Sequence, residues 1–198
     1  MLALPFNTEV NKQLPKAAIY RSFDSHSLPR ERFDSDVSKI VIVNELSPAT
    51  LPIAEGNTVK SIFVLDVILK RKEYDVRNIV ALSKLILQKM LFVLQKDDMI
   101  QLVVMHTQLI ISDWNKMERY KLQLSGLNLD TVWENIVKQV GNIQLEEENT
   151  LTEQIATNAE RIKIEKQIEM LEKRCRAERQ AHKKYELHKQ IIELNKLL

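Results

Sequence analysis

The chain has 198 residues, of which 44% are hydrophobic and 28% are charged, with 29 Lys and Arg against 27 Asp and Glu. This length and apolar fraction suffice for a folded core, while the net charge of +2 does not by itself indicate a nucleic-acid partner. The three glycines argue against a glycine-rich phosphate loop, and the one cysteine excludes an internal disulfide and a cysteine-based zinc site.

The location and the cofactors can also be predicted from the sequence. The N-terminus lacks the basic start and the apolar length of a signal peptide, and no apolar run reaches the roughly 18 residues of a membrane span. His182 and His188 are six residues apart, whereas a metal-binding pair on a helix is separated by four. We therefore expect a cytoplasmic protein with no membrane association, no metal and no cofactor.

Residues 1–26 form an N-terminal segment of mixed character, in which Thr8 to Pro15 fit a short helix that ends at the proline. Residues 27–141 show the pattern of an α+β domain. Apolar runs at 39–46 and 59–70 predict two strands, and the second run is nearly uninterrupted, which is typical of a central strand.

The stretch from Met90 to Met105 predicts a β-hairpin at the middle of the sheet, because two apolar runs flank a short polar break. A helix capped by Asp75 precedes it, and runs at 109–112 and 117–124 fit further antiparallel strands. Asp130 and the Thr-x-x-Glu box that follows it predict a helix that runs to Val140. The expected fold is α+β, with a mainly antiparallel five-stranded sheet and packed helices.

Residues 145–198 contain neither Gly nor Pro and have the composition of a long charged helix or coiled coil. Apolar residues along this tail form an uneven seam that is a candidate partner-binding surface: Ile164, Ile168, Leu171, Tyr185 and Ile192. The seam fits a homo-oligomer, a helical hairpin, a helix that folds back on the domain, or a helix that docks to a partner protein.

Seven basic side chains lie between residues 173 and 189, against only Glu178 and Glu186. Such a stripe can follow the phosphates of a nucleic acid, or it can be a solvated helix face with ion pairs four residues apart. The candidate nucleic-acid-binding residues are Lys173, Arg174, Arg176, Arg179, Lys183 and Lys184.

Several segments together resemble one family: residues 7–16, residues 40–50 with Asn-Glu-Leu-Ser-Pro-Ala-Thr, Leu91-Phe-Val-Leu, Ser125-Gly-Leu-Asn-Leu-Asp and the charged C-terminal helix. This is similar to a bacterial and archaeal family known only as a domain of unknown function, over nearly the whole chain. Its members tend to be encoded beside superfamily-2 helicases and DNA methyltransferases, in clusters that resemble restriction or antiphage defence islands. The resemblance implies a DNA-related setting with such a partner, and it carries no catalytic residues.

Only Glu45, Asp66 and Lys70 fit the trio of a metal-dependent nuclease, in which carboxylates on adjoining strands hold Mg²⁺ and a lysine steadies the attacking water. Asp66 and Lys70 are four residues apart, which places them on one face of a strand, but the usual acidic-x-Lys triplet is absent. We therefore expect a non-catalytic accessory or adaptor protein that binds a partner protein or DNA through its helical tail. A divergent metal-dependent nuclease is the alternative.

Overall fold

The structure, a computed structural model, describes residues 2–21, 30–146 and 149–198. The chain divides into two compact units, residues 1–144 and residues 145–198. The boundary expected between residues 26 and 27 lies outside the described residues. The strand and the helix found before that boundary belong to the first unit.

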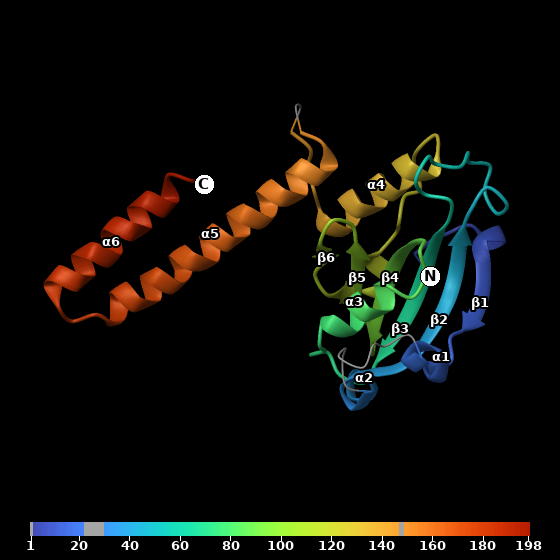
Figure 1. The fold of residues 1–198 in the computed structure, drawn as a ribbon, viewed down its shortest axis with the longest axis horizontal. Helices are drawn as coiled ribbons and strands as arrows, with labels where there is room; N and C mark the ends of the chain where they lie inside the picture. Colours follow the sequence, from blue (N-terminus) through green and yellow to red (C-terminus); the bar gives the residue numbers. More distant parts are fainter. Residues whose placement is uncertain (1, 22–29, 147–148) are drawn as a thin grey trace. The chain divides into compact units, whose positions relative to one another are not determined.

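The first unit is built on a seven-stranded mixed sheet (Figure 1). Six strands follow one another across it in chain order: β1 (Glu9–Gln13), β2 (Val37–Leu46), β3 (Ile62–Leu69), β4 (Lys89–Lys96), β5 (Met99–Met105) and β6 (Leu109–Ile111). The short strand β7 (Asn115–Lys116) pairs with β5 as well. The α+β class is therefore confirmed, but the expectation of five mainly antiparallel strands is wrong in the number of strands and in their mixed arrangement.

The mixed character comes from β3 and β4, which are parallel and are joined through helix α3 (Arg77–Ser83). Parallel neighbours need such a crossover, because the chain must return to the end of the sheet where the first strand began. All the other strand pairings in the described residues are antiparallel. A helix was expected between two apolar strands. This strand–helix–strand order is the βαβ pattern, which indicates a parallel pair.

The expected hairpin is confirmed, because β4 and β5 pair from Leu91 and Val104 to Lys96 and Met99. Its turn consists of Asp97 and Asp98, and Asp97 has a φ of 55°, in the left-handed region that tight hairpin turns favour.

The edge strand β1 occupies the place where a short helix was expected, with all five of its residues exposed. It pairs with β2, and the register shifts between Glu9 and Lys12, around Asn11 with a φ of 52°. Pairing with β2 provides hydrogen-bond partners for the backbone N–H and C=O groups of β1. An isolated helix of this length is too unstable to keep its own backbone hydrogen bonds. Helix α1 (Lys16–Arg21) follows directly after Pro15.

Both faces of the sheet are covered. Helices α1, α2 (Arg30–Asp36) and α3 pack on one face, where the buried side chains include Phe33, Ile79, Leu82, Leu65, Val67 and Phe92. Helix α4 (Leu129–Gly141) packs against β5 and β6, and its buried residues are Leu129, Val132, Trp133, Ile136, Val137 and Val140. Short 3-10 helices occur at Phe6–Thr8 and Met117–Arg119.

The second unit consists of two helices, α5 (Leu151–Ala177) and α6 (Ala181–Asn195), which pack side by side as an antiparallel hairpin (Figure 1). The capping box of Thr150 and Glu153 begins α5. No helix among the described residues is long and apolar enough to cross a membrane.

The cap of α4 differs from the expectation, because Asn128 forms the capping box with Thr131. The Asp130 carboxylate instead accepts hydrogen bonds from the amides of Asn57, Thr58 and Val59, at 2.6 to 3.2 Å, and from the Thr58 hydroxyl. These hydrogen bonds, the Thr58 hydroxyl first among them, hold the pKa of Asp130 below its usual value. The loop before β3 is thereby fixed to the start of α4.

We expect Gly56→Ala to destabilise the first unit. A Cβ at this position would lie 2.4 Å from Asp130 Oδ1 and 2.7 Å from the Asp130 backbone nitrogen, so the loop and α4 would have to separate. The free energy of unfolding, measured by urea denaturation, should fall by about 1 to 3 kcal/mol. Ala54→Gly, in the same loop, removes a Cβ without adding one and serves as the control; equal stability of G56A and wild type would contradict this packing.

Candidate nucleic-acid interface

The hairpin of α5 and α6 uses most of the expected apolar seam for its own core. Ile168, Leu171 and Ile191 are buried between the helices, with Ile164, Cys175, Leu187 and Leu194 packed against them. Two of the candidate partner-binding residues, Tyr185 and Ile192, lie outside this core, and their exposed fractions are 70% and 45%. The structure thus has the hairpin that was one of the alternatives for the tail, and it divides the seam into an inner and an outer part.

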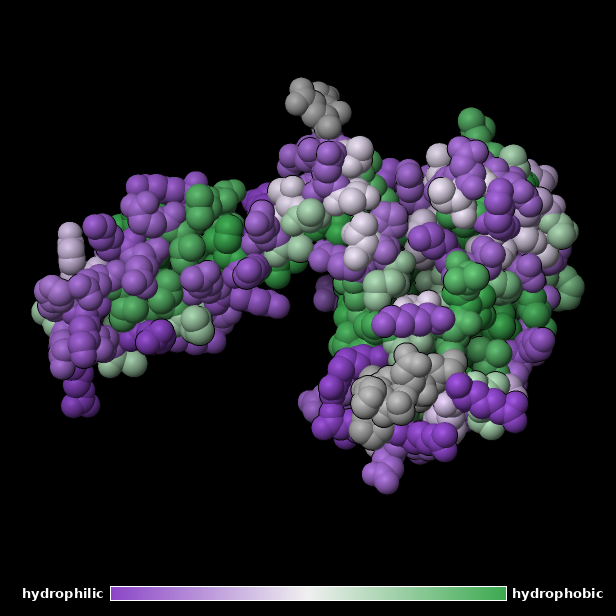
Figure 2. Space-filling model, viewed as in Figure 1, coloured by the Kyte–Doolittle hydropathy of each residue, from purple (hydrophilic) through white to green (hydrophobic). Residues whose placement is uncertain are grey.

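The same folding gathers the basic residues at one end of the hairpin. Helix α5 ends at Ala177 and α6 begins at Ala181, so the basic residues before and after the turn lie around one tip, which we define as residues 173–189. The Cys175 thiol lies 3.7 Å from the Lys184 carbonyl oxygen, which shows how closely the two helices approach there. Figure 2 shows hydrophilic residues over this end of the hairpin.

Two hollows on the tip each contain basic side chains from both helices. Arg174 and Lys183 line one hollow, of about 420 Å³, together with Glu178 and Glu186. Arg176 and Lys184 line the other, of about 280 Å³, together with Glu172. Each hollow therefore presents an α5 arginine and an α6 lysine to the same volume of solvent.

Few of these cations are neutralised by neighbours. Lys173 forms an ion pair with Glu169 at 2.7 Å, and Arg176 pairs with Glu172 at 3.7 Å. The other candidates form no ion pair within 4.0 Å in the described part of the chain: Arg174, Arg179, Lys183 and Lys184. All six candidate side chains belong to exposed residues.

The turn contains both the N-terminus of α6 and one carboxylate. Gln180 precedes α6 without capping it through its side chain, and no acidic residue lies in the first turn of the helix. Such an N-terminus carries unsatisfied N–H groups and a partial positive charge. The Glu178 carboxylate accepts a hydrogen bond from the Gln180 amide at 2.8 Å, which lowers the pKa of Glu178. This acidic group therefore supports the turn.

The possible nuclease trio is not brought together by the fold. Asp66 lies opposite Val41 and Val93 on one face of the sheet, whereas Glu45 pairs with Phe63, whose side chain packs in the core on the other face. Lys70 lies beyond the end of β3, and its Nζ donates to the Asp34 carbonyl oxygen at 2.5 Å.

A β-bulge in β2 separates the two carboxylates. Ile42 pairs with Leu65 and Asn44 pairs with Val64, so Val43 is an extra residue on this strand. Without it, Glu45 would pair with Ile62 and share a face with Asp66, because side chains alternate along a strand. One inserted residue therefore decides that these carboxylates point to opposite sides of the sheet.

Asp66 by itself is an acidic group among apolar neighbours. Burial raises its pKa, and the charge of Lys39 opposes that shift. Its Oδ1 is buried and has no hydrogen-bond partner among the described residues. In that same part of the chain, no three Asp, Glu, His or Cys side chains form a group that could hold a metal ion.

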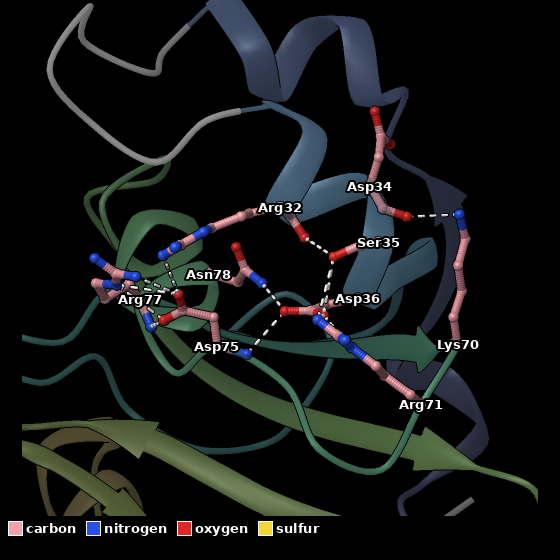
Figure 3. Close-up of polar contacts among 9 residues, drawn as sticks. All are labelled: Arg32, Asp34, Ser35, Asp36, Lys70, Arg71, Asp75, Arg77 and Asn78. Carbon is pink, nitrogen blue, oxygen red and sulfur yellow. Dashed lines mark hydrogen bonds and ion pairs between the residues drawn. The ribbon is translucent and has the colours of Figure 1, made fainter.

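A second polar cluster surrounds Asp36, whose side chain is 1% exposed (Figure 3). Its carboxylate accepts hydrogen bonds from Arg71 Nε at 2.7 Å, from the Asp75 amide at 2.8 Å and from Asn78 Nδ2 at 2.8 Å. Burial alone would raise the pKa of Asp36, but these donors outweigh it and hold the pKa below its usual value. Because internal donors occupy this carboxylate, its role is to fix the turn between β3 and α3.

No local sequence signal indicates the Asp36 cluster or the role of Asp130. The partners of Asp36 lie 35 to 42 residues away along the chain, and those of Asp130 lie 71 to 73 residues away. The basic residues of the tip were all found from composition, but their gathering across a turn was not, because the turn at 178–180 contains neither Gly nor Pro.

We expect Leu171→Ala to loosen the hairpin, because Leu171 is 6% exposed in a core with few other buried residues. The loss should be about 2 kcal/mol, at the lower end of the range for buried leucines. Hydrogen exchange across α5 and α6 measures it. Ile192→Ala, on the outer side of α6, is the matched control and should change exchange little; equal effects of L171A and I192A would contradict the assignment of inner and outer residues.

We expect Asp36→Asn to destabilise the first unit by about 1 to 3 kcal/mol at neutral pH, because charged hydrogen bonds to three donors are weakened. A carboxylate with a lowered pKa stabilises the fold above its unfolded-state pKa of about 3.9, and this contribution is lost as the pH falls through the folded-state value. Urea unfolding from pH 7 to pH 2 should therefore show the two proteins converging in acid. Asp113→Asn, at an exposed residue, is the control; a difference that stays constant down to pH 2 would refute this role.

Residues 2–198 match the family described as Domain of unknown function (DUF4391). The chain therefore belongs to this family, and the resemblance noted in the sequence is confirmed at that level. Nothing among the curated proteins or the solved structures matches the chain.

Proposed function

We propose that this member of the DUF4391 family is a non-catalytic accessory protein whose C-terminal hairpin binds the phosphate backbone of DNA through its basic tip. One observation carries the proposal: the turn between α5 and α6 brings cations of two helices to the same two hollows, Arg174 with Lys183 and Arg176 with Lys184. Cations placed together repel each other, and a polyanion that lies between them relieves this repulsion.

The form of the tip suits a backbone more than a small anion. Its cations are spread over both sides of a turn and belong to exposed residues, whereas a small-anion site needs donors that converge on one point. Contacts of this kind bind without reading the sequence and weaken as salt is added. We therefore propose a salt-sensitive interaction with little sequence preference.

A partner protein is the second candidate for the tail, and the outer face of α6 favours it. Tyr185 and Ile192 are seven residues apart, so they lie on one stripe, and both are largely exposed. By contrast, Ile164, Ile168 and Leu171 pack within the hairpin, so they support this candidate only if the hairpin opens.

The non-catalytic part of the proposal is supported by the positions of Glu45, Asp66 and Lys70. A metal-dependent nuclease needs two carboxylates on one side of the sheet, and the bulge at Val43 turns Glu45 away from Asp66. We further propose a cytoplasmic setting beside a helicase or DNA methyltransferase of a restriction or antiphage defence system, which is what the resemblance of the sequence implies.

The test is the binding of a fluorescent DNA duplex to the full chain and to the triple variant R174Q/K183Q/K184Q, by anisotropy at several salt concentrations. Glutamine keeps the helix propensity and removes the charge. We expect the variant to bind more weakly and its plot of log K against log salt to lose up to about 0.9 of slope for each phosphate contact removed.

The matched control is R161Q/K163Q/K166Q, which removes the same charge from exposed residues of α5 outside the tip. It should bind as the wild type does. Equal loss in both variants would indicate a general charge effect, and unchanged binding by the tip variant would overturn the proposed DNA contact.

A further inference from the structure

A pocket of about 360 Å³ lies in the first unit, where α3 ends, β4 begins and β5 ends. This volume is within the lower part of the range for small-molecule sites. Nine residues line the pocket: Ser83, Lys84, Ile86, Leu87, Gln88, Lys89, Met90, Met105 and His106. It is formed entirely by residues of the first unit and shares no residue with the hairpin tip.

The charge of the lining is of one sign. Lys84 and Lys89 contribute two cations, and no carboxylate is among the lining residues. Burial, followed by the charge of Lys89, lowers the pKa of His106, although nearby Glu134 opposes the shift. His106 is therefore neutral near pH 7, and the cationic character of the pocket comes from the two lysines.

The cation of Lys89 lies over an aromatic ring. Its Nζ lies 5.7 Å from the centre of the Trp133 ring, and Trp133 Nε1–H donates a hydrogen bond to His106 Nδ1 at 3.2 Å. Trp133 is 2% exposed, so this arrangement rests on a fixed ring of α4. A pre-positioned charge loses less freedom when it binds a ligand than a lysine that moves freely in solvent.

The rest of the lining is mixed, because Ser83 and Gln88 are polar and the other four side chains are apolar. Met90 and Met105 contribute thioether side chains, and Ile86 lies beside them. Leu87 also lines the pocket, and it is fully exposed. The pocket therefore offers two cations together with flexible apolar surface that adapts to the shape of a ligand.

We propose that this pocket binds a small molecule that carries an anionic group on an apolar or aromatic body. Lys84 and Lys89 bind the anionic group, and the body packs against Met90, Met105 and Leu87. A nucleotide and an acyl carboxylate share this chemistry, and the experiment distinguishes between them.

The probes are adenosine monophosphate, decanoate and inorganic phosphate, each titrated at millimolar concentration into the full chain in a Trp114→Phe background. Trp133 is then the only tryptophan, and its emission reports on Lys89 and His106. Calorimetry measures the dissociation constant independently of the fluorescence. We expect adenosine monophosphate or decanoate to bind and inorganic phosphate to bind at least tenfold more weakly, because it lacks the apolar body.

Lys84→Gln and Lys89→Gln should each weaken the bound probe by about tenfold, as the loss of one charged hydrogen bond does. Lys121→Gln removes a charge from an exposed residue that does not line the pocket and should have no effect. If only one organic probe binds, that probe identifies the class of ligand. Equal binding of both shows that an anionic group and an apolar body are sufficient for binding. No binding by either organic probe, binding unaffected by K84Q and K89Q, or phosphate that binds as well as the organic anions would overturn the proposal.

Discussion

The fold of the first unit depends on the buried carboxylate of Asp36, which connects the start of β2 to the turn after β3. It accepts from the Asp75 amide, from Asn78 of α3 and from Arg71, so the chain is held where it leaves the sheet and enters the crossover. That crossover makes β4 parallel to β3 and places the β4–β5 hairpin beside it. A buried charge without these donors would be costly, so the stability of the cluster depends on the crossover that supplies them.

The two central strands, β3 and β4, limit the chemistry that the sheet can support. They are apolar on both faces and covered by helices, which leaves little room for polar chemistry. Asp66 is the exception, and the bulge at Val43 places the nearest candidate carboxylate, Glu45, on the opposite face. The sheet itself therefore offers little surface for binding, and both proposals place binding elsewhere, at the start of β4 and on the hairpin of α5 and α6.

The hairpin of α5 and α6 is a different kind of structure. Its core contains few fully buried side chains, so its stability comes from a narrow stripe between two helices. Its tip collects like charges, which a protein tolerates only where water or a ligand surrounds them. Both properties suit an element that contacts another molecule, and they are the physical reason for proposing that the tail is the binding element.

The sequence by itself determined the features that depend on neighbours in the chain. The apolar runs around Asp97 gave the β4–β5 hairpin, and the tail composition gave the helices and all six candidate cations. Only the tertiary structure decided the pairing of β3 with β4, the bulge that separates Glu45 from Asp66, and the turn that folds the tail onto itself. The strand pairing depends on contacts across the α3 crossover, the separation of the carboxylates on one extra residue in β2, and the folding of the tail on a turn without Gly or Pro. Side-chain periodicity indicates none of these.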